Sequence, residues 1–221
     1  RSTNAGGTYT QVLSGIATDV VIDPTNANIM YASNGNVFGA PSNGVYKSTN
    51  GGANWSLLAG GLPTTAVGRI ALAISASSPS TIYATIQDSS TFGLRGVWKT
   101  TDSGATWTQL GATNASCATQ CWYDMAISVD PTNANTVYFS GFSLYKSTDG
   151  GATFTDIGTT IHVDHHAFAF MPGAPSTIFA GSDGGIFKST NGGGSWISLN
   201  NTLNITQFYG GMGVHPTDAN I

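Results

Sequence analysis

The sequence contains no glutamate, and charge of either sign is sparse along its whole length. Only 8% of the 221 residues are charged, and the formal net charge at pH 7 is −4. Four of the seven basic residues are spaced along the chain instead of clustered: Lys47, Lys99, Lys146 and Lys188. Nucleic-acid-binding domains carry a basic patch or stripe, so we expect no nucleic-acid partner.

Long apolar runs are also lacking. No run approaches the roughly 18 apolar residues of a membrane span, so we expect no membrane partner. No signal peptide is present, and because the sequence starts inside a repeated motif at Arg1, we expect any leader to have been removed already. Glycine, with 29 residues, is abundant, which favours many short strands joined by turns.

Cysteine is limited to Cys117 and Cys121. A disulfide between them would close a very small loop and stabilise the fold by about 2 kcal/mol, which suits an oxidising compartment. Two free thiols are the alternative. A structural zinc site needs four ligands, and without a second cysteine pair we expect none.

The sequence does contain a recurring motif that starts with Ser or Thr, continues with Asp or Asn and then Gly, and ends on an aromatic residue. Its copies start at Ser2, Ser48, Thr100, Ser147 and Ser189, with spacings of 42 to 52 residues. These residue types describe a tight hairpin: the Asx side chain caps the turn, Gly takes a positive φ, and the aromatic ring fills the layer underneath. We interpret each copy as a structural staple.

The repeat spacing predicts the fold, because a four-stranded propeller blade has about 40 to 50 residues. A second repeated phrase, Asp19 to Ala32, returns at Met125 to Phe139 in the same phase. We predict an all-β β-propeller with four-stranded antiparallel blades. Residues 1–221 form one partial domain of four full blades, preceded by one outer strand and followed by one inner strand. Open edges seek pairing, so a missing segment or another chain is expected to complete the ring.

The motif resembles the Asp-box, or BNR repeat, of sialidases, sortilin-type receptors, photosystem assembly factors and glycoside hydrolase family 74 xyloglucanases. In those families the box joins the third and fourth strands of a blade, on the face away from the active site. The resemblance implies a propeller but leaves the function open, because enzymes, receptors and assembly factors share the motif.

Sialidase chemistry is not expected. Those enzymes pair a Glu with a Tyr nucleophile and grip the substrate with three arginines, whereas this sequence has no Glu. Its three arginines are Arg1, Arg69 and Arg95, and Arg1 belongs to a box turn on the wrong face.

Candidate site residues lie where the repeats differ. The segment from Thr160 to Phe168 contains three of the four histidines, and alignment of the inner strands gives four residues one blade position: Arg69, Asp124, His165 and Tyr209. We predict that these side chains converge near the mouth of the axial channel. Capping of strand ends is the alternative.

The second difference between the repeats is Asp183, because only this copy of the hairpin between the second and third strands has a carboxylate before paired glycines. The stretch is similar to a family 74 hairpin in which such an aspartate is one of two catalytic carboxylates, so the resemblance implies a catalytic Asp183. The family's second carboxylate lies on another propeller domain; Asp164, or else Asp124, could replace it here. An inverting glycosidase needs one carboxyl group with a raised pKa. An ordinary turn residue is the alternative for Asp183.

Trp122 and Tyr123 follow the cysteine pair on a loop expected to open on the same face, where such rings stack on sugars. Packing under the loop is the alternative. The predicted catalytic residues are Asp183 and Asp164, and the predicted substrate-binding residues are His165, His166, Arg69, Asp124, Trp122, Tyr123 and Tyr209. We further expect proximity to raise one carboxyl pKa and to keep a histidine protonated.

The predicted function is a secreted carbohydrate-active propeller, part of a glycoside hydrolase that acts on β-glucan or xyloglucan-type polysaccharide. A non-catalytic propeller that binds glycan or protein is the alternative. No cofactor is expected, and Ca²⁺ held by aspartate oxygens is the remaining alternative.

Overall fold

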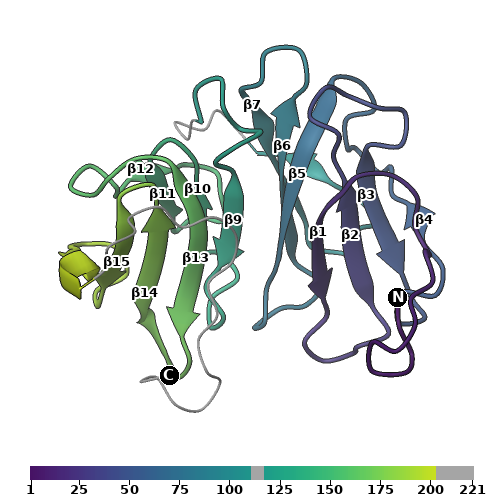
Figure 1. Cartoon of the computed structure of the whole chain (residues 1–221), viewed down its shortest axis with the longest axis horizontal. Helices are drawn as coiled ribbons and strands as arrows, with labels where there is room; N and C mark the ends of the chain where they lie inside the picture. The colour runs from purple at the N-terminus through teal and green to yellow at the C-terminus, as the bar shows by residue number, and fades with distance from the viewer. Residues whose placement is uncertain (111–116, 203–221) are drawn as a thin grey trace.

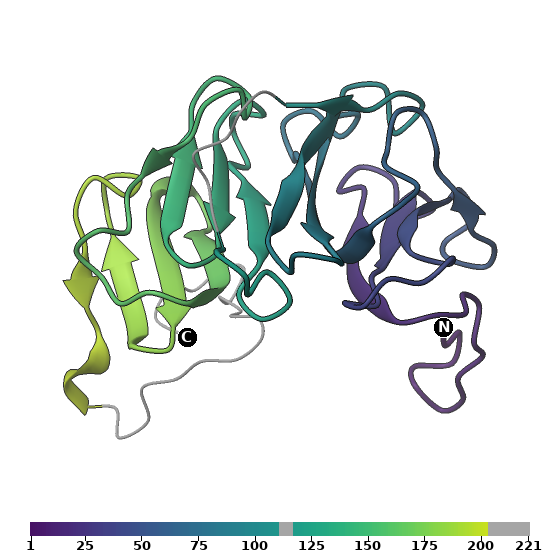
Figure 2. The ribbon, with the colours of Figure 1, turned by 90° about the horizontal axis from the view of Figure 1, so that it is seen from above.

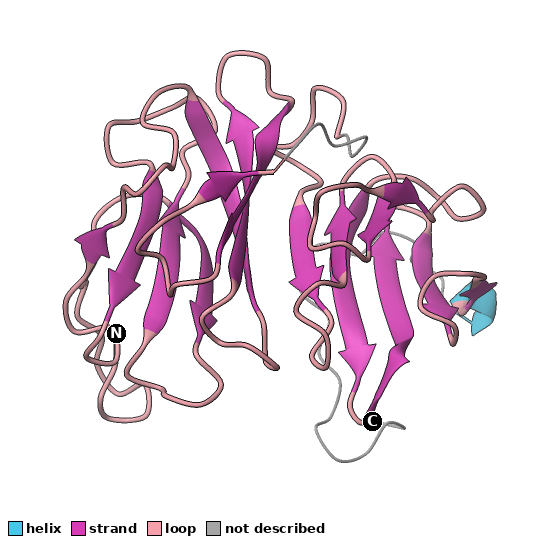
Figure 3. Ribbon diagram, turned by 180° about the vertical axis from the view of Figure 1, so that it is seen from behind, coloured by secondary structure: helices cyan, strands magenta, loops and turns pink. Residues whose placement is uncertain are grey.

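The computed structural model describes residues 1–110 and 117–202. Within these residues the chain forms four antiparallel sheets of four strands each and one short 3-10 turn, Asn200–Thr202. Strands account for nearly all of the regular structure (Figure 3). In every sheet the strands follow one another in chain order, as in a propeller blade. The predicted all-β propeller with four complete blades is confirmed.

The strands of each blade run from the inner to the outer edge. The first blade contains β1 (Ala17–Ile22), β2 (Met30–Asn34), β3 (Gly44–Ser48) and β4 (Ser56–Leu57). The second contains β5 (Val67–Ile74), β6 (Ile82–Asp88), β7 (Leu94–Thr100) and β8 (Thr108–Gln109). The third contains β9 (Ala126–Val129), β10 (Val137–Ser140), β11 (Leu144–Ser147) and β12 (Thr155–Asp156). The fourth contains β13 (His165–Met171), β14 (Ala174–Ser182), β15 (Gly185–Ser189) and β16 (Ile197–Ser198).

The blades form an arc, because each inner strand packs beside the inner strand of the next blade (Figures 1 and 2). The apolar core lies between the blades. One cluster joins the first and second blades around Ile70, and another joins the second and third around Phe139. Between the third and fourth blades, Tyr138 stacks on Phe168 with the ring centroids 4.8 Å apart.

The repeated motif makes the same hydrogen bonds in all five copies, which we call box hairpins (residues 2–9, 48–55, 100–107, 147–154 and 189–196). In the second copy Ser48 Oγ donates to Asn50 Oδ1 at 3.0 Å and accepts from the Gly52 amide at 2.9 Å. The Asn54 amide donates to the same Asn50 oxygen at 2.9 Å. The other four copies repeat these bonds. Gly52, with φ +77°, supplies the left-handed residue that the turn requires.

The aromatic residues of the box hairpins fill the core where a neighbouring blade covers them. Trp107 is 4% exposed and Phe154 is 3% exposed. Tyr9, in the first copy, is 78% exposed. The interpretation of the motif as a staple therefore holds for the covered copies.

The first and third blades also bond the box hairpin of the blade that follows each of them. Tyr31 Oη and Lys47 Nζ both donate to the carbonyl of Ser103, at 2.9 and 2.7 Å. Tyr138 and Lys146 make the same pair of bonds to the carbonyl of Gly192. In addition, each lysine lies above an aromatic ring, 5.4 Å from the ring centroid for Lys47 and Tyr31. In the fourth blade the ring beneath the lysine is that of Phe179, which has no hydroxyl group.

The N-terminal end of the arc differs from the prediction of an outer strand. Arg1 and Thr10 exchange two backbone hydrogen bonds of 2.7 and 2.8 Å, but the pairing stops there, and no strand precedes β1 in residues 1–16. The predicted final inner strand, residues 212–221, lies outside the described residues. Val20 of β1 is 58% exposed, and the pairing of this edge with another segment or chain stays a prediction. Among the described residues, no helix is long and apolar enough to cross a membrane.

Candidate functional site

The box hairpins and the candidate residues lie at opposite ends of the blades. Four box hairpins follow a third strand (β3, β7, β11 or β15), and in the first three of these blades the hairpin contacts the turn after the inner strand, as the bond from the Gly51 amide to the Asn28 carbonyl shows (3.0 Å). Asp183 lies between β14 and β15, and Asp164 directly precedes β13. In an antiparallel blade these connections emerge at the other end, which we call the site face. The predicted separation of the two faces is confirmed.

Asp183 is held by side chains from two blades. Its Oδ1 lies 2.7 Å from His166 Nε2, and the hydroxyl group of Tyr123 donates to both carboxylate oxygens at 3.2 Å. The Tyr123 and His166 rings meet edge to face with the centroids 4.6 Å apart. A carboxylate is an acceptor-only group, which suits two donors. Tyr123, predicted to bind substrate by stacking, therefore also orients Asp183.

The paired glycines after Asp183 are required by close packing. A Cβ atom on Gly184 would overlap the side chain of His162, and one on Gly185 would overlap Asn200. Asn200 fixes the turn from below, since its Nδ2 donates to the Gly184 carbonyl at 2.8 Å and its Oδ1 accepts from the Ile186 amide at 2.8 Å. The turn therefore presents Asp183 in one defined position.

A β-bulge at the start of β13 explains which histidine reaches Asp183. His165 pairs with Ser182 and Ala167 pairs with Gly181, so His166 is an additional residue on this strand. Bulges commonly re-aim a side chain. A similar register shift occurs in β5 between Val67 and Ile70, in the segment that contains Arg69. His165 pairs with Ser182 as Ile70 pairs with Ile86, so the register places His165 level with Ile70, whereas the sequence alignment placed it level with Arg69.

His165 is fully buried, and neither of its ring nitrogens has a hydrogen-bond partner among the described residues. Burial lowers the pKa of His165 to about 4, with a further contribution from His166 and His162. The expectation of a protonated histidine is therefore wrong for His165, because desolvation outweighs the nearby carboxylates. In this conformation the ring does not reach the site face, so the substrate-binding role predicted for it has no support from the geometry.

Two further carboxyl groups, those of Asp124 and Asp164, lie near Asp183. Asp124 is 0% exposed and Asp164 is partly exposed. Nε2 of Gln120 donates to Asp124 Oδ2 at 3.0 Å and also contacts Asp164 Oδ1. Burial, reinforced by the charge of Asp164, raises the pKa of Asp124 to about 7. The expected raised carboxyl pKa is present, although desolvation is its main cause. The backbone ties this pair to Asp183, whose amide donates to the Asp164 carbonyl at 3.2 Å.

Arg69 contacts the backbone of the loop that carries Trp122 and Tyr123. Its Nη1 donates to the carbonyls of Trp122 and Tyr123 at 3.3 and 2.9 Å. Burial lowers the pKa of Arg69, while the charges of Asp19 and Asp124 oppose that shift. The guanidinium group therefore holds the Trp122 and Tyr123 backbone, a positioning role that differs from the predicted contact with substrate.

The Cys117–Cys121 disulfide is formed, and both cysteines are buried. The Cys121 amide donates to the Phe92 carbonyl at 3.0 Å, which fixes the loop on the second blade. Trp122 follows directly and is 50% exposed, with its ring 5.5 Å from that of Tyr123. The predicted exposed ring is therefore available for stacking.

Two predictions have no counterpart in the described residues. Tyr209 lies outside them. In residues 1–110 and 117–202, no group of three or more His, Cys, Asp or Glu side chains is arranged to hold a metal ion. Calcium, which was only the alternative to no cofactor, has no ligand set in these residues.

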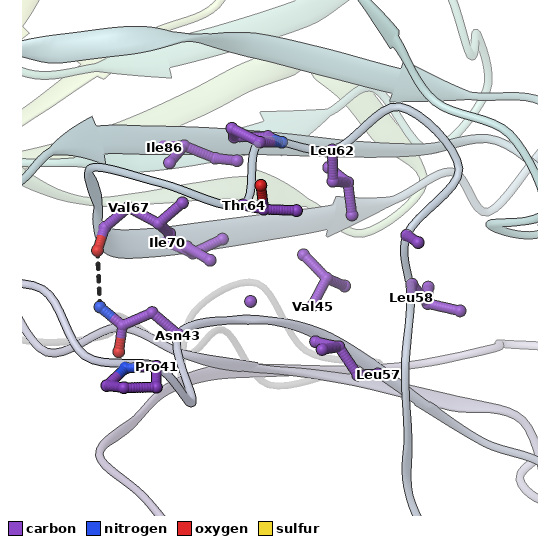
Figure 4. A pocket seen from close by; sticks show the side chains of 13 residues that line it. Pro41, Asn43, Val45, Leu57, Leu58, Leu62, Thr64, Val67, Ile70 and Ile86 are labelled. Atoms are coloured by element: carbon purple, nitrogen blue, oxygen red, sulfur yellow. Dashed lines mark hydrogen bonds between the residues drawn. The ribbon is translucent and has the colours of Figure 1, made fainter.

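An apolar cavity of about 120 Å³ lies elsewhere, between the first and second blades (Figure 4). Val45, Leu62 and Ile70 are among the side chains that line it. Asn43 closes one end, and its Nδ2 donates to the Val67 carbonyl at 2.7 Å. The cavity includes none of the predicted site residues.

Sequence reasoning missed Gln120. It precedes Asp124 by four residues, but this spacing alone does not indicate that its amide group contacts two carboxyl groups from different blades. That contact depends on the packing of the third blade on the fourth.

Comparisons with known proteins place the fold. No protein-family model matches the sequence, and no curated protein matches it. Among solved structures, the chain is similar to the GH74 enzyme of Niastella koreensis, with a TM-score of 0.67 and 20% identity over 85% of this chain and 30% of that one. An ancestral GH74 enzyme gives a TM-score of 0.57 and 23% identity over 82% and 24%. YCF48 bound to D1 peptide gives 0.56 and 12% over 85% and 51%.

All three identities are below 25%, so the similarity shows a shared propeller fold. The chain spans 24% to 30% of the two GH74 chains and 51% of the YCF48 chain. Both enzymes and a peptide-bound protein therefore use blades of this kind.

Proposed function

We propose that this chain is part of a secreted carbohydrate-active propeller that hydrolyses neutral polysaccharide of the β-glucan or xyloglucan type. The observation that carries the proposal is a pair of unlike carboxyl sites on one face. Asp183 accepts hydrogen bonds from His166 and Tyr123, whereas Asp124, beside Asp164, is protonated in about half of the molecules near pH 7, because burial raises its pKa to about 7. Glycosidases that use two carboxyl groups need one of each kind.

The buried Asp124 holds the proton, because its pKa is about 7, and the partly exposed Asp164 is the proposed general acid that passes this proton to the substrate. Asp164 gives a proton to the glycosidic oxygen while the bond from that oxygen to the anomeric carbon breaks. Asp183 takes a proton from a water molecule whose oxygen forms the new bond to the same carbon. Atoms and charge balance, since the proton lost by the pair equals the proton gained by Asp183.

Secretion is part of the proposal. The Cys117–Cys121 disulfide persists in an oxidising compartment and is rare in the cytosol. The predicted glycan partner is polymeric and occurs outside cells, which fits the same location.

Asp164→Asn tests the acid assignment. Reducing-sugar release from xyloglucan should fall by roughly two to three orders of magnitude, because general acid catalysis contributes about 10²- to 10⁴-fold. An aryl glucoside with an acidic phenol leaving group needs little protonation, so its hydrolysis should fall much less. Asp130→Asn, in a turn at the box end, is the matched charge control. Equal losses on both substrates would contradict the assignment.

A non-catalytic glycan- or protein-binding propeller is the second candidate. The observation in its favour is that both oxygens of Asp183 already have donors, as in a structural tie between blades. Saturable binding of polysaccharide without any release of reducing ends would favour this candidate over hydrolysis.

A further inference from the structure

Aromatic rings lie on three consecutive blades at the site face. Phe38, in the β2–β3 loop, is 77% exposed, and Phe142, in the β10–β11 turn, is 44% exposed. Phe92, in the β6–β7 loop, is half-buried and meets Phe38 edge to face with the ring centroids 6.0 Å apart. Together with Trp122 they form what we call the aromatic row: Phe38, Phe92, Trp122 and Phe142. None of these phenylalanines has a role in the carboxyl site.

Backbone contacts connect the aromatic row to the carboxyl groups. The Phe92 carbonyl accepts from the amide of Cys121, the residue before Trp122, and the Phe142 carbonyl accepts from the Asp164 amide at 3.1 Å. Trp122 in turn lies against Tyr123, which holds Asp183. The row therefore leads from the first blade to the carboxyl site.

Phe92 is held in a costly backbone conformation. Its φ is +61°, a region that bulky residues rarely adopt. Hydrogen bonds from the Phe92 amide to the Asp88 carbonyl and from the Cys121 amide to the Phe92 carbonyl maintain it. Such strain concentrates at binding and catalytic sites, where it places a side chain that an unstrained turn would direct elsewhere.

The charge of this face favours a neutral ligand. Arg95 pairs with Asp88 at 3.3 Å, and Arg69 is turned toward backbone carbonyls. The other basic residues all directly precede box hairpins, at the opposite end: Arg1, Lys47, Lys99, Lys146 and Lys188. In the described residues, both arginines of the site face are thus already engaged, which leaves an anionic polymer without a cationic partner.

The polar residues between the rings of the aromatic row favour a glycan ligand over a protein. Apart from the contact between Phe38 and Phe92, the rings alternate along the chain with small polar turn residues, such as Ser89, Ser90 and Thr91 before Phe92, and not with a contiguous patch of apolar residues. Protein interfaces favour such contiguous patches. A pyranose ring has an apolar face that stacks on an aromatic ring and a rim of hydroxyl groups that polar residues can bond.

We infer that the aromatic row binds an extended, neutral polysaccharide chain across the first three blades and leads it to Asp183. The inference rests on the glycan part of the proposed function, but not on catalysis. It adds that the ligand is a polymer long enough to span several blades, and that Phe38 and Phe92 bind it far from the reacting carboxyl groups.

Affinity electrophoresis and calorimetric titration of the full chain test the inference, with xyloglucan as the neutral polymer and polygalacturonate as the anionic one. Phe38→Ala and Phe92→Gly should each weaken xyloglucan binding by roughly three- to tenfold, as expected for the loss of one ring contact. Phe92→Gly should not lower the melting temperature, because glycine accepts a positive φ. Tyr9→Ala, which removes an exposed ring outside the row, is the matched control and should bind like the wild type.

The outcomes separate this inference from the proposed hydrolysis. Xyloglucan binding that depends on Phe38 and Phe92 without any hydrolysis would support the row and overturn catalysis. Hydrolysis that is unaffected in Phe38→Ala and Phe92→Gly would overturn the row and leave catalysis standing. Preference for polygalacturonate, an equal loss in Tyr9→Ala, or no binding to either polymer would overturn the row.

Discussion

Nε2 of His166 lies 2.7 Å from Oδ1 of Asp183, and the two side chains differ in exposure: 3% for the histidine and 25% for the aspartate. The His166 side chain is therefore buried, and the Asp183 carboxylate is the group that solvent reaches. This relationship depends on the bulge in β13, because His166 is the additional residue that the bulge inserts between His165 and Ala167. Asp183 rather than His166 is therefore the group of this pair that a ligand can reach.

The pH dependence of stability should reveal the buried carboxyl group. The pKa of Asp124 is about 7 in the folded chain against 3.8 as the ordinary value, so the folded state binds more protons between these pH values. Its contribution to stability is present below about pH 4 and is lost as the pH rises through 7. Asp124→Asn, which mimics the protonated form, should match the wild type near pH 4 and exceed it at pH 8 by about 2 to 4 kcal/mol in unfolding free energy.

His165 acts in the opposite direction over a similar range. Its pKa is about 4 in the folded chain against 6.5 as the ordinary value, so its contribution falls as the pH drops from 6.5 to 4. The wild type should therefore show a flatter profile than Asp124→Asn, which retains only the acid-side loss. Urea unfolding from pH 4 to pH 8 measures both profiles, and identical slopes in the two proteins would contradict the buried carboxyl assignment.

The box hairpins should stabilise the fold through their buried rings. Trp107→Ala removes a ring that is 4% exposed at the contact of two blades, so unfolding free energy should fall by about 3 to 5 kcal/mol. Tyr9→Ala changes the same motif position where the ring is exposed, and its effect should stay within about 0.5 kcal/mol. Chemical denaturation compares them, and equal losses would show that the motif position matters more than burial.

The hydroxyl groups that connect one blade to the next should each contribute separately. Tyr83 Oη donates to the Ala134 carbonyl in the third blade at 2.9 Å. Tyr83→Phe should lower the free energy of unfolding by about 1 kcal/mol, the usual value for a net hydrogen bond. The fourth blade already has a phenylalanine, Phe179, at this position. Thermal melting measures the effect with Tyr9→Phe as the control. An unchanged melting temperature in Tyr83→Phe would mean that the connection contributes nothing.

The blades could be predicted from the sequence because their signals are local. Ser48, Asn50 and Gly52 satisfy one another within five residues, so the hairpin follows directly from its residue types. The placement of Asp183 on the face opposite the box hairpins follows from chain direction alone.

The directions of neighbouring side chains could not be predicted in the same way. His166, and not His165, contacts Asp183 because β13 has one additional residue at this point. Nothing in the local sequence marks that bulge. The roles of Gln120 and Arg69 depend on contacts between blades, where a side chain meets residues more than 40 positions away. The resemblance to family 74 indicated Asp183, but the surrounding donors become apparent only in the packed structure.

The most direct test of the proposed catalytic role of Asp183 is xyloglucan hydrolysis by Asp183→Asn, measured together with its xyloglucan affinity and its melting temperature. The substitution keeps the size of the side chain, and Asn43 occupies the equivalent turn in the first blade. We predict a loss of at least two orders of magnitude in reducing-sugar release, with affinity and melting temperature close to those of the wild type. Wild-type hydrolysis by Asp183→Asn would contradict it and return Asp183 to the status of a turn residue.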